Sequence, residues 1–189
     1  PGRFTPERRL RRECFSNEDE KVLMHISNFR PVKRIPDIIE VFEGVASRMK
    51  ARLILVGDGP EKERARSLVD RKGLNANVHF IGRQNDVSTL LPCADLYLLL
   101  SEHESFGLTA LEAMSCQVPV IGTSGSGMDS FLGDGAAGML FQVGDVASMV
   151  EGCIRILENP DLARRMGENG RKRVVEQFHQ DTIVEQYEQ

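Results

Sequence analysis

The chain of 189 residues carries a formal net charge of -4, with 41% hydrophobic and 28% charged residues. This length suits one domain with a sizeable core, and this composition is typical of a soluble globular protein. The negative net charge argues against a nucleic-acid partner, and no apolar run is long enough for a membrane span or a signal peptide.

The four cysteines lie far apart in the sequence and form no CxxC pair, so neither a zinc site nor a redox site is predicted. Cys93 and Cys116 stand in apolar runs, and we expect them to be buried, which fits a reducing cytoplasm. Residues 1–20 are polar and rich in arginine and glutamate, which predicts a linker or N-terminal extension before one domain at 21–189. The sequence starts at Pro1 without a methionine, so we expect a fragment of a longer protein.

Short apolar runs alternate with amphipathic stretches along the chain. The runs predict strands at 21–27, 51–60, 77–82, 95–101 and 118–122. The amphipathic stretches predict helices at 35–49, 61–73, 86–94 and 107–115. A loop rich in glycine and serine at 123–138 leads to a short strand, "MLFQ", and two or three helices at 145–159, 160–178 and 181–189 end the chain.

This alternation predicts a doubly wound parallel sheet, an α/β fold of the Rossmann-like type, with helices on both faces. In such sheets, ligands bind at the carboxyl ends of the strands. We therefore expect a site built from four loops, at 27–33, 57–61, 82–86 and 101–107.

The segment "SEHESFGLTALEAMS" follows a predicted buried strand and opens a helix. Gly107 allows close approach of a ligand, and the first N–H groups of the helix favour an anion such as phosphate. Glu104 stands just before the helix, where a carboxylate suits sugar hydroxyls, and Glu112 lies in an apolar stretch where ribose hydroxyls would satisfy it. The alternative is that Glu104 caps the helix and Glu112 is a structural acid with protein partners.

The segment "SNFRPVKR" places Arg30, Lys33 and Arg34 after the first strand, where cations could neutralise a diphosphate. The alternative is a solvated basic turn. The turn "VGDGP" lacks the GxGxxG pattern, and the chain has no GxSxG, HExxH or P-loop motif. The histidines lack metal-ligand spacing, and His25 and His79 are expected within strands, so no metal site is predicted.

The segment "ESFGLTALEAMSCQVPVIGT" resembles the E-x7-E region of retaining glycosyltransferases of the GT-B fold, group 1 (family 4). The segments "HISNFRPVKR", "LILVGDGPE", "HFIGRQNDV" and "NPDLARRMGENGRKRVVEQF" follow the family's order, so the resemblance covers nearly the whole chain. It implies that the chain is the carboxyl-terminal half of a two-domain enzyme and binds the nucleotide-sugar donor. The acceptor site would lie on a missing amino-terminal domain, and no cofactor is implied.

The resemblance also implies roles for particular residues. Glu104 would bind hydroxyls of the donor sugar, Glu112 the ribose hydroxyls and Lys33 the diphosphate, with Glu104 and Lys33 counted as catalytic. Backbone N–H groups would approach the sugar and diphosphate from Ser105, Phe106, Gly107 and Leu108. Arg83 and Gln84 would hold the base through their backbone. Lys33 and the helix N-terminus would stabilise negative charge on the leaving diphosphate without a metal, since no DxD-type site is evident.

The sequence departs from the family pattern at two places. Asn28 stands where the family has an arginine, and Arg30 is the candidate substitute. Asp129 and Ser130 replace the proline and glutamate of a Gly-Gly-x-Pro-Glu pattern, so the geometry of that loop is not predicted.

The resemblance implies transfer of N-acetylglucosamine from UDP-N-acetylglucosamine, with L-malate as a candidate acceptor in bacillithiol biosynthesis. Two alternatives remain: a non-catalytic nucleotide- or sugar-binding module, and a GT-B sugar epimerase, for which no convincing acid/base residues are found. No heptad pattern predicts a coiled coil, and the sequence predicts no oligomeric state.

Overall fold

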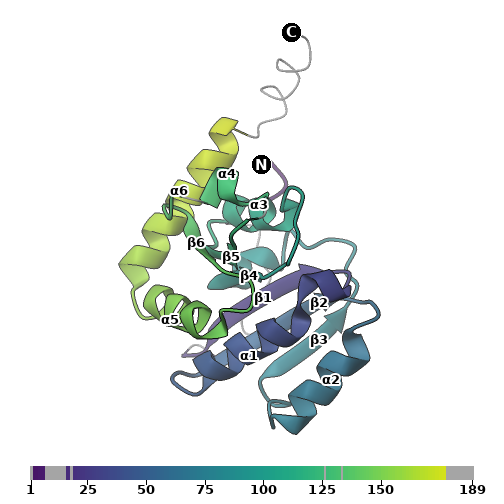
Figure 1. Ribbon diagram of the computed structural model, residues 1–189. Helices are drawn as coiled ribbons and strands as arrows, with labels where there is room; N and C mark the ends of the chain where they lie inside the picture. The colour runs from purple at the N-terminus through teal and green to yellow at the C-terminus, as the bar shows by residue number, and fades with distance from the viewer. Residues whose placement is uncertain (1, 7–15, 18, 126, 133, 178–189) are drawn as a thin grey trace.

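The computed structural model describes residues 2–6, 16–17, 19–125, 127–132 and 134–177 (Figure 1). A six-stranded sheet forms its centre, in the order β3-β2-β1-β4-β5-β6, and every pair of neighbouring strands is parallel. The predicted doubly wound, Rossmann-like α/β fold is therefore confirmed. The strands are β1 (Lys21–Ser27), β2 (Ala51–Gly57), β3 (Val78–Gly82), β4 (Leu96–Leu99), β5 (Val120–Thr123) and β6 (Gly138–Phe141).

Helices cover both faces of this sheet and enclose two hydrophobic cores (Figure 1). On one face lie α1 (Ile35–Ala46), α2 (Lys62–Arg71) and α5 (Val146–Leu157). On the other face lie α3 (Leu108–Ser115) and α4 (Asp129–Leu132). The last described helix, α6 (Pro160–Gln177), contributes Met166 to the first core and Val174 to the second, so it joins the two layers.

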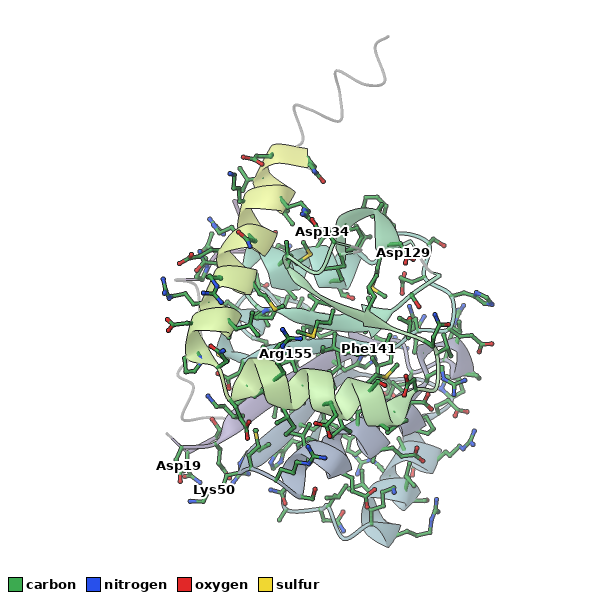
Figure 2. All side chains as sticks on the ribbon, turned by 60° about the vertical axis from the view of Figure 1, so that its left-hand side comes forward. Asp19, Lys50, Asp129, Asp134, Phe141 and Arg155 are labelled. Carbon is green, nitrogen blue, oxygen red and sulfur yellow. The ribbon has the colours of Figure 1, made fainter. Side chains whose placement is uncertain are left out.

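The helical spacing of apolar residues predicted the buried face of α1 correctly. Ile38, Ile39, Phe42 and Val45 are all fully buried against the sheet. Helix α5 lies beside α1 and passes in front of the sheet next to β6 (Figure 2). A Cβ at Gly152 would lie 2.5 Å from the ring of Phe141, so this glycine lets the helix approach the edge strand closely.

The strand order reverses between β1 and β4. The chain runs outward from β1 through β2 to β3, then returns to β4 and continues to β5 and β6. The ladder between β1 and β4 pairs only Leu23 with Leu96 and Met24 with Tyr97. The carboxyl ends of these two strands therefore flank the topological switch point, where doubly wound sheets bind their ligands.

Two predicted elements were wrong. Residues 86–94 do not form a helix opened by Asp86, because the Asp86 side chain accepts hydrogen bonds from the N–H and hydroxyl of Ser88 and makes a local turn. Only a 3-10 helix at Leu91–Cys93 follows. The predicted loop at 123–138 contains the short helix α4. The predicted helix at 181–189 and most of the predicted linker at 1–20 lie outside the described residues.

The cysteines within the described part of the chain are Cys93, Cys116 and Cys153, and all three are buried free thiols. The prediction for Cys93 and Cys116 is confirmed. None of the described helices has the length and apolar character needed to cross a membrane.

Candidate functional site

Lys33 and Glu104 meet at the switch point. The ammonium nitrogen of Lys33 lies 2.6 Å from Oε2 of Glu104. Lys33 ends a 3-10 turn, Pro31–Lys33, that follows β1, and Glu104 stands in the loop after β4. The two side chains are 19% and 16% exposed, so the pair is partly screened from water but open to a ligand.

The loop that carries Lys33 turns sharply at two residues in the left-handed region, Phe29 (φ 40°) and Arg34 (φ 50°). The guanidinium of Arg34 binds Asp37 in the first turn of α1, with 2.7 Å between Nε and Oδ2. The N–H of Glu102 donates to the carbonyl of Val32 at 2.9 Å and ties this loop to the loop after β4. The two segments that form the site thus hold each other in place.

Three further contacts fix Glu104. Its carboxylate accepts from the hydroxyl of Ser101 at 3.3 Å and, weakly, from the N–H of Gly107 at 3.4 Å. Its own carbonyl accepts from the N–H of Gly127 at 2.7 Å. A Cβ at Gly127 would lie 2.3 Å from the carbonyl oxygen of Ser105, so only glycine allows this approach. The long contact to Gly107 makes helix capping a minor part of what Glu104 does.

The N-terminus of α3 points into the same region. Gly107 is the N-cap residue at φ 67°, and no side-chain hydrogen bond caps the helix. The first N–H groups of a helix have no partner within the helix, so this end can receive an anion. Phe106 and Leu108, beside Gly107, have exposed fractions of 45% and 65%, and Ser105 is also exposed.

Glu112 lies on α3, half-buried, and burial raises its pKa above the ordinary glutamate value, while the charge of Arg3 opposes that shift. No residue in the described part of the chain donates a hydrogen bond to its carboxylate. A buried carboxylate normally has such donors. Both Glu104 and Glu112 lie close enough to the buried Tyr97 to raise the pKa of its hydroxyl, although burial is the larger cause.

A pocket of about 330 Å³ lies at the carboxyl ends of β1, β2 and β3. It brings together three predicted residues, Asn28, Arg83 and Gln84, and adds Asp58 and Asn85, which the sequence did not single out. The side chain of Gln84 donates to the carbonyl of Ile81 at 2.8 Å, which orders the turn after β3. In the sequence, the only indication that Asp58 and Asn85 belong to the site is their position in loops at the carboxyl ends of strands.

Arg30 is exposed at the rim, directly before the 3-10 turn that carries Lys33. Asp129 and Ser130, at the positions that depart from the family pattern, begin α4 and are exposed (Figure 2 labels Asp129). The hydroxyl of Ser130 donates to the carbonyl of Gly127 at 3.0 Å, so this turn is part of the support behind Glu104. Within the described residues, no group of three or more His, Cys, Asp or Glu side chains could hold a metal ion.

The sequence matches the model of a protein family described as glycosyl transferases group 1 over residues 6–173. N-acetyl-alpha-D-glucosaminyl L-malate synthase from Bacillus anthracis is 45% identical over 179 residues, which are 95% of this chain and 47% of that protein. Poly(ribitol-phosphate) alpha-N-acetylglucosaminyltransferase from Staphylococcus aureus (strain COL) is 28% identical over 172 residues, 90% of this chain and 35% of that protein.

Solved structures share the fold. Sucrose-phosphate synthase from Thermosynechococcus elongatus superposes with a TM-score of 0.89 at 28% identity, covering 98% of this chain and 48% of that one. A mutant of TarM from S. aureus, in complex with Fondaparinux, alpha-GlcNAc-glycerol and UDP, gives 0.83 at 26% identity, covering 91% and 35%. The chain spans about half or less of each of these relatives.

Proposed function

This chain belongs to the glycosyl transferases group 1 family, and from that premise we propose that it is the donor-binding half of a retaining GT-B glycosyltransferase. The observation that carries the proposal is the contact of Lys33 with Glu104 beside the uncapped N-terminus of α3. One site then offers a cation and free amides for a diphosphate, and a carboxylate for sugar hydroxyls.

Each part of a nucleotide sugar has a complementary part of the site. The diphosphate lies against Lys33 and the backbone N–H groups of Ser105 to Leu108, where the chain enters α3. The sugar hydroxyls donate to Glu104, and the ribose hydroxyls donate to Glu112. The base enters the pocket lined by Asn28, Arg83 and Gln84, whose volume of about 330 Å³ is large enough for one heterocycle.

Transfer with retention passes through an oxocarbenium-like transition state, in which negative charge grows on the leaving diphosphate. The helix amides stabilise this charge because the backbone fixes their direction before the reaction, and Lys33 adds a positive charge when the diphosphate draws it from Glu104. Glu104 holds the sugar by its hydroxyls and fixes the direction in which the anomeric carbon faces the acceptor. The family has an arginine at the position of Asn28. In this chain Arg30, at the rim of the site, supplies that second cation instead.

The names of relatives support a donor and an acceptor. The relative from B. anthracis is named for joining N-acetylglucosamine to L-malate. The TarM complex contains UDP and alpha-GlcNAc-glycerol. We therefore assign UDP-N-acetylglucosamine as donor and L-malate as acceptor, with the acceptor held by a domain outside this chain. The buried free thiols of Cys93, Cys116 and Cys153 fit a reducing compartment, and we assign the enzyme to the cytoplasm.

The test uses the whole polypeptide that the gene encodes. Calorimetry measures binding of UDP, UDP-N-acetylglucosamine and UDP-glucose, with ADP as the control nucleotide. Mass spectrometry then follows transfer to L-malate, and NMR identifies the anomer formed. We expect UDP to bind more tightly than ADP and the product to be the α-anomer. Failure to bind any UDP compound contradicts the proposal, whereas binding without transfer to any hydroxy acid indicates a non-catalytic binding module.

A further inference from the structure

We propose that His25 and Ser27 are positioning residues for this site: a directed chain of hydrogen bonds through their side chains holds the turn that carries Asn28, Arg30 and Lys33. The proposal rests on the proposed function, because it explains how the diphosphate-binding loop is held. The His25 side chain is 0% exposed, so it acts only through other residues. Ser27 lines the pocket at the carboxyl ends of β1, β2 and β3, and its proposed role is the hydrogen bond that it accepts from Phe29.

The site requires β1 and β4 to separate at their carboxyl ends. Their ladder stops at Met24 and Tyr97, three residues before β1 ends at Ser27. Beyond that point the backbones no longer pair with each other. Other groups must then hold the two strands at a fixed separation, because buried backbone groups without partners are costly.

Two side chains bridge this gap from opposite strands. His25 of β1 reaches across to the carbonyl of Leu98 in β4, with 2.8 Å from Nδ1 to the oxygen. Tyr97 of β4 reaches back to Ile26 of β1, where its hydroxyl donates to the carbonyl at 3.2 Å and accepts from the N–H at 3.3 Å. The two rings are stacked, 6.5 Å apart at 18°. Together they replace the missing rungs of the ladder.

The chemistry of these partners fixes the direction of each hydrogen bond. A carbonyl can only accept, so Nδ1 of His25 carries the proton and Nε2 is the acceptor. Nε2 lies 2.7 Å from Oγ of Ser27, so the hydroxyl of Ser27 donates to it. Burial lowers the pKa of His25 to about 4, opposed by the Leu98 contact, so the ring is neutral at pH 7 and keeps this acceptor.

The hydroxyl of Ser27 then accepts from the N–H of Phe29 at 3.2 Å. Phe29 has φ 40°, a left-handed conformation that is uncommon and costs energy for a residue other than glycine. This contact stabilises the turn that sends the chain from β1 toward Lys33. The hydrogen-bond chain therefore runs from the N–H of Phe29 through Ser27 and His25 to β4, the strand that leads to Glu104.

Two glycines, one at the end of β2 and one in the loop that follows it, hold the turn from the other side. A Cβ at Gly57 would lie 1.8 Å from the carbonyl oxygen of Ser27, and one at Gly59 would lie 1.9 Å from that of Asn28. The carbonyl of Phe29 accepts from the N–H of Glu61 at 3.0 Å. These contacts fix the position of the turn but not its left-handed conformation, for which Ser27 supplies the hydrogen bond.

The test compares Ser27→Ala with Ser27→Thr in the complete polypeptide. Ser27→Ala removes the link between Phe29 and His25, and we expect kcat/KM for the donor to fall 10-fold to 100-fold, as small misplacements of a binding group do. Ser27→Thr keeps the hydroxyl and is expected to stay within about threefold of the wild type. Ser115→Ala is the matched control, because it removes one buried hydroxyl bond, to Leu111 at 2.9 Å, at the far end of α3.

His25→Asn supplies the second test. Its side-chain amide can still donate to Leu98 but leaves Ser27 without an acceptor, so its loss of kcat/KM should match that of Ser27→Ala. The double variant should then be no worse than either single variant, because both break the same chain. Thermal midpoints are measured for every variant to compare folding with the Ser115→Ala control.

The possible results separate the two proposals. If the wild type binds no UDP compound, the proposed function is overturned. If the wild type binds and Ser27→Ala has the donor kinetics of Ser115→Ala, only the positioning role is overturned. The positioning role is also overturned if Ser27→Thr loses as much kcat/KM for the donor as Ser27→Ala does. It is overturned as well if the loss in Ser27→Ala is fully explained by a lower thermal midpoint.

Discussion

The ammonium of Lys33 and the carboxylate of Glu104 lie 2.6 Å apart although the residues are 71 positions apart in the chain. Without a ligand, each charge neutralises the other, which lowers the cost of holding both in a partly buried place. A diphosphate would attract Lys33 and leave Glu104 free to accept from sugar hydroxyls. Recognition of the phosphate and of the sugar would then be coupled through this one contact.

Lys33→Ala in the complete enzyme is expected to lower kcat by about 10²-fold to 10³-fold, because a cation is lost from the leaving diphosphate. Steady-state kinetics with saturating donor measures this. Lys72→Ala is the matched control: Lys72 contacts Glu43 at 2.6 Å and is 22% exposed, but joins α2 to α1 away from the site. Unchanged kinetics in Lys33→Ala would remove Lys33 from the mechanism.

Lys33→Ala and Glu104→Gln together give a second measurement on the same contact. If the two side chains act as a unit, the double variant loses less activity than the product of the single losses. Independent actions predict multiplied losses. The double-mutant cycle is measured on kcat/KM for the donor, and strict additivity would contradict the coupling.

Glu112→Gln is expected to weaken UDP binding by about 1–3 kcal/mol, since the ribose hydroxyls lose a charged acceptor. Calorimetry measures the affinity, and Glu151→Gln, on the distant helix α5, is the control. Burial raises the pKa of Glu112, so its neutral form appears at a higher pH than for an ordinary glutamate. UDP affinity of the wild type should therefore fall as the pH drops through this raised pKa, and the fall should be absent in Glu112→Gln.

The raised pKa of Glu112 also predicts that acidification, which weakens UDP binding, makes the unliganded protein more stable at this residue. A carboxyl whose folded-state pKa is raised makes the folded protein less stable where the group is ionised, at pH 7, and this cost disappears on acidification. The unliganded Glu112→Gln variant should therefore unfold at an equal or higher temperature than the wild type. A lower thermal midpoint would show that the carboxylate has stabilising partners.

The periodicity of apolar residues predicted the sheet and most helices because burial of strands on two faces leaves a strong signal. It missed α4, since four residues following glycines give too short a pattern. The pattern could predict that Lys33 and Glu104 follow the carboxyl ends of two strands, and these ends lie at the same edge of a parallel sheet. It could not predict their contact, which depends on the backbone conformations of Phe29 and Arg34, both at positive φ without being glycine.

The role of Gly127 in holding Glu104 was likewise invisible in the sequence. Gly127→Ala is expected to lower kcat by at least tenfold, because its Cβ would collide with the carbonyl of Ser105 and displace the loop that carries Glu104. Gly125→Ala is the control in the same loop. It has positive φ (76°) but open space around a Cβ, so it should cost only about 1 kcal/mol of stability and little activity. Equal kinetic losses in both variants would contradict the steric argument.

Asp134, labelled in Figure 2, lies in the turn between α4 and β6. It contacts the guanidinium of Arg173 on α6, and this side-chain contact lowers the pKa of Asp134 to about 2. Arg173 also donates to the carbonyl of Phe131, so the contact ties α6 to the helix that packs under Gly107. The side chain of Asp134 is 53% exposed, so solvent screens the contact and we expect it to contribute at most about 1 kcal/mol.

Asp134→Asn should therefore lower the thermal midpoint by at most about 2–4 °C at pH 7. A carboxyl whose folded-state pKa is lowered stabilises the protein above its unfolded pKa, and this stabilisation is lost as the pH falls toward about 2. When urea unfolding is measured at pH 7, 5 and 3, the difference between variant and wild type should be the same at pH 7 and 5 and smaller at pH 3. Asp161→Asn, which breaks an exposed pair with Arg164 within α6, should have a smaller effect. A difference for Asp134→Asn that stays constant across this pH range would show that the charge of Asp134 does not contribute to holding α6 in place.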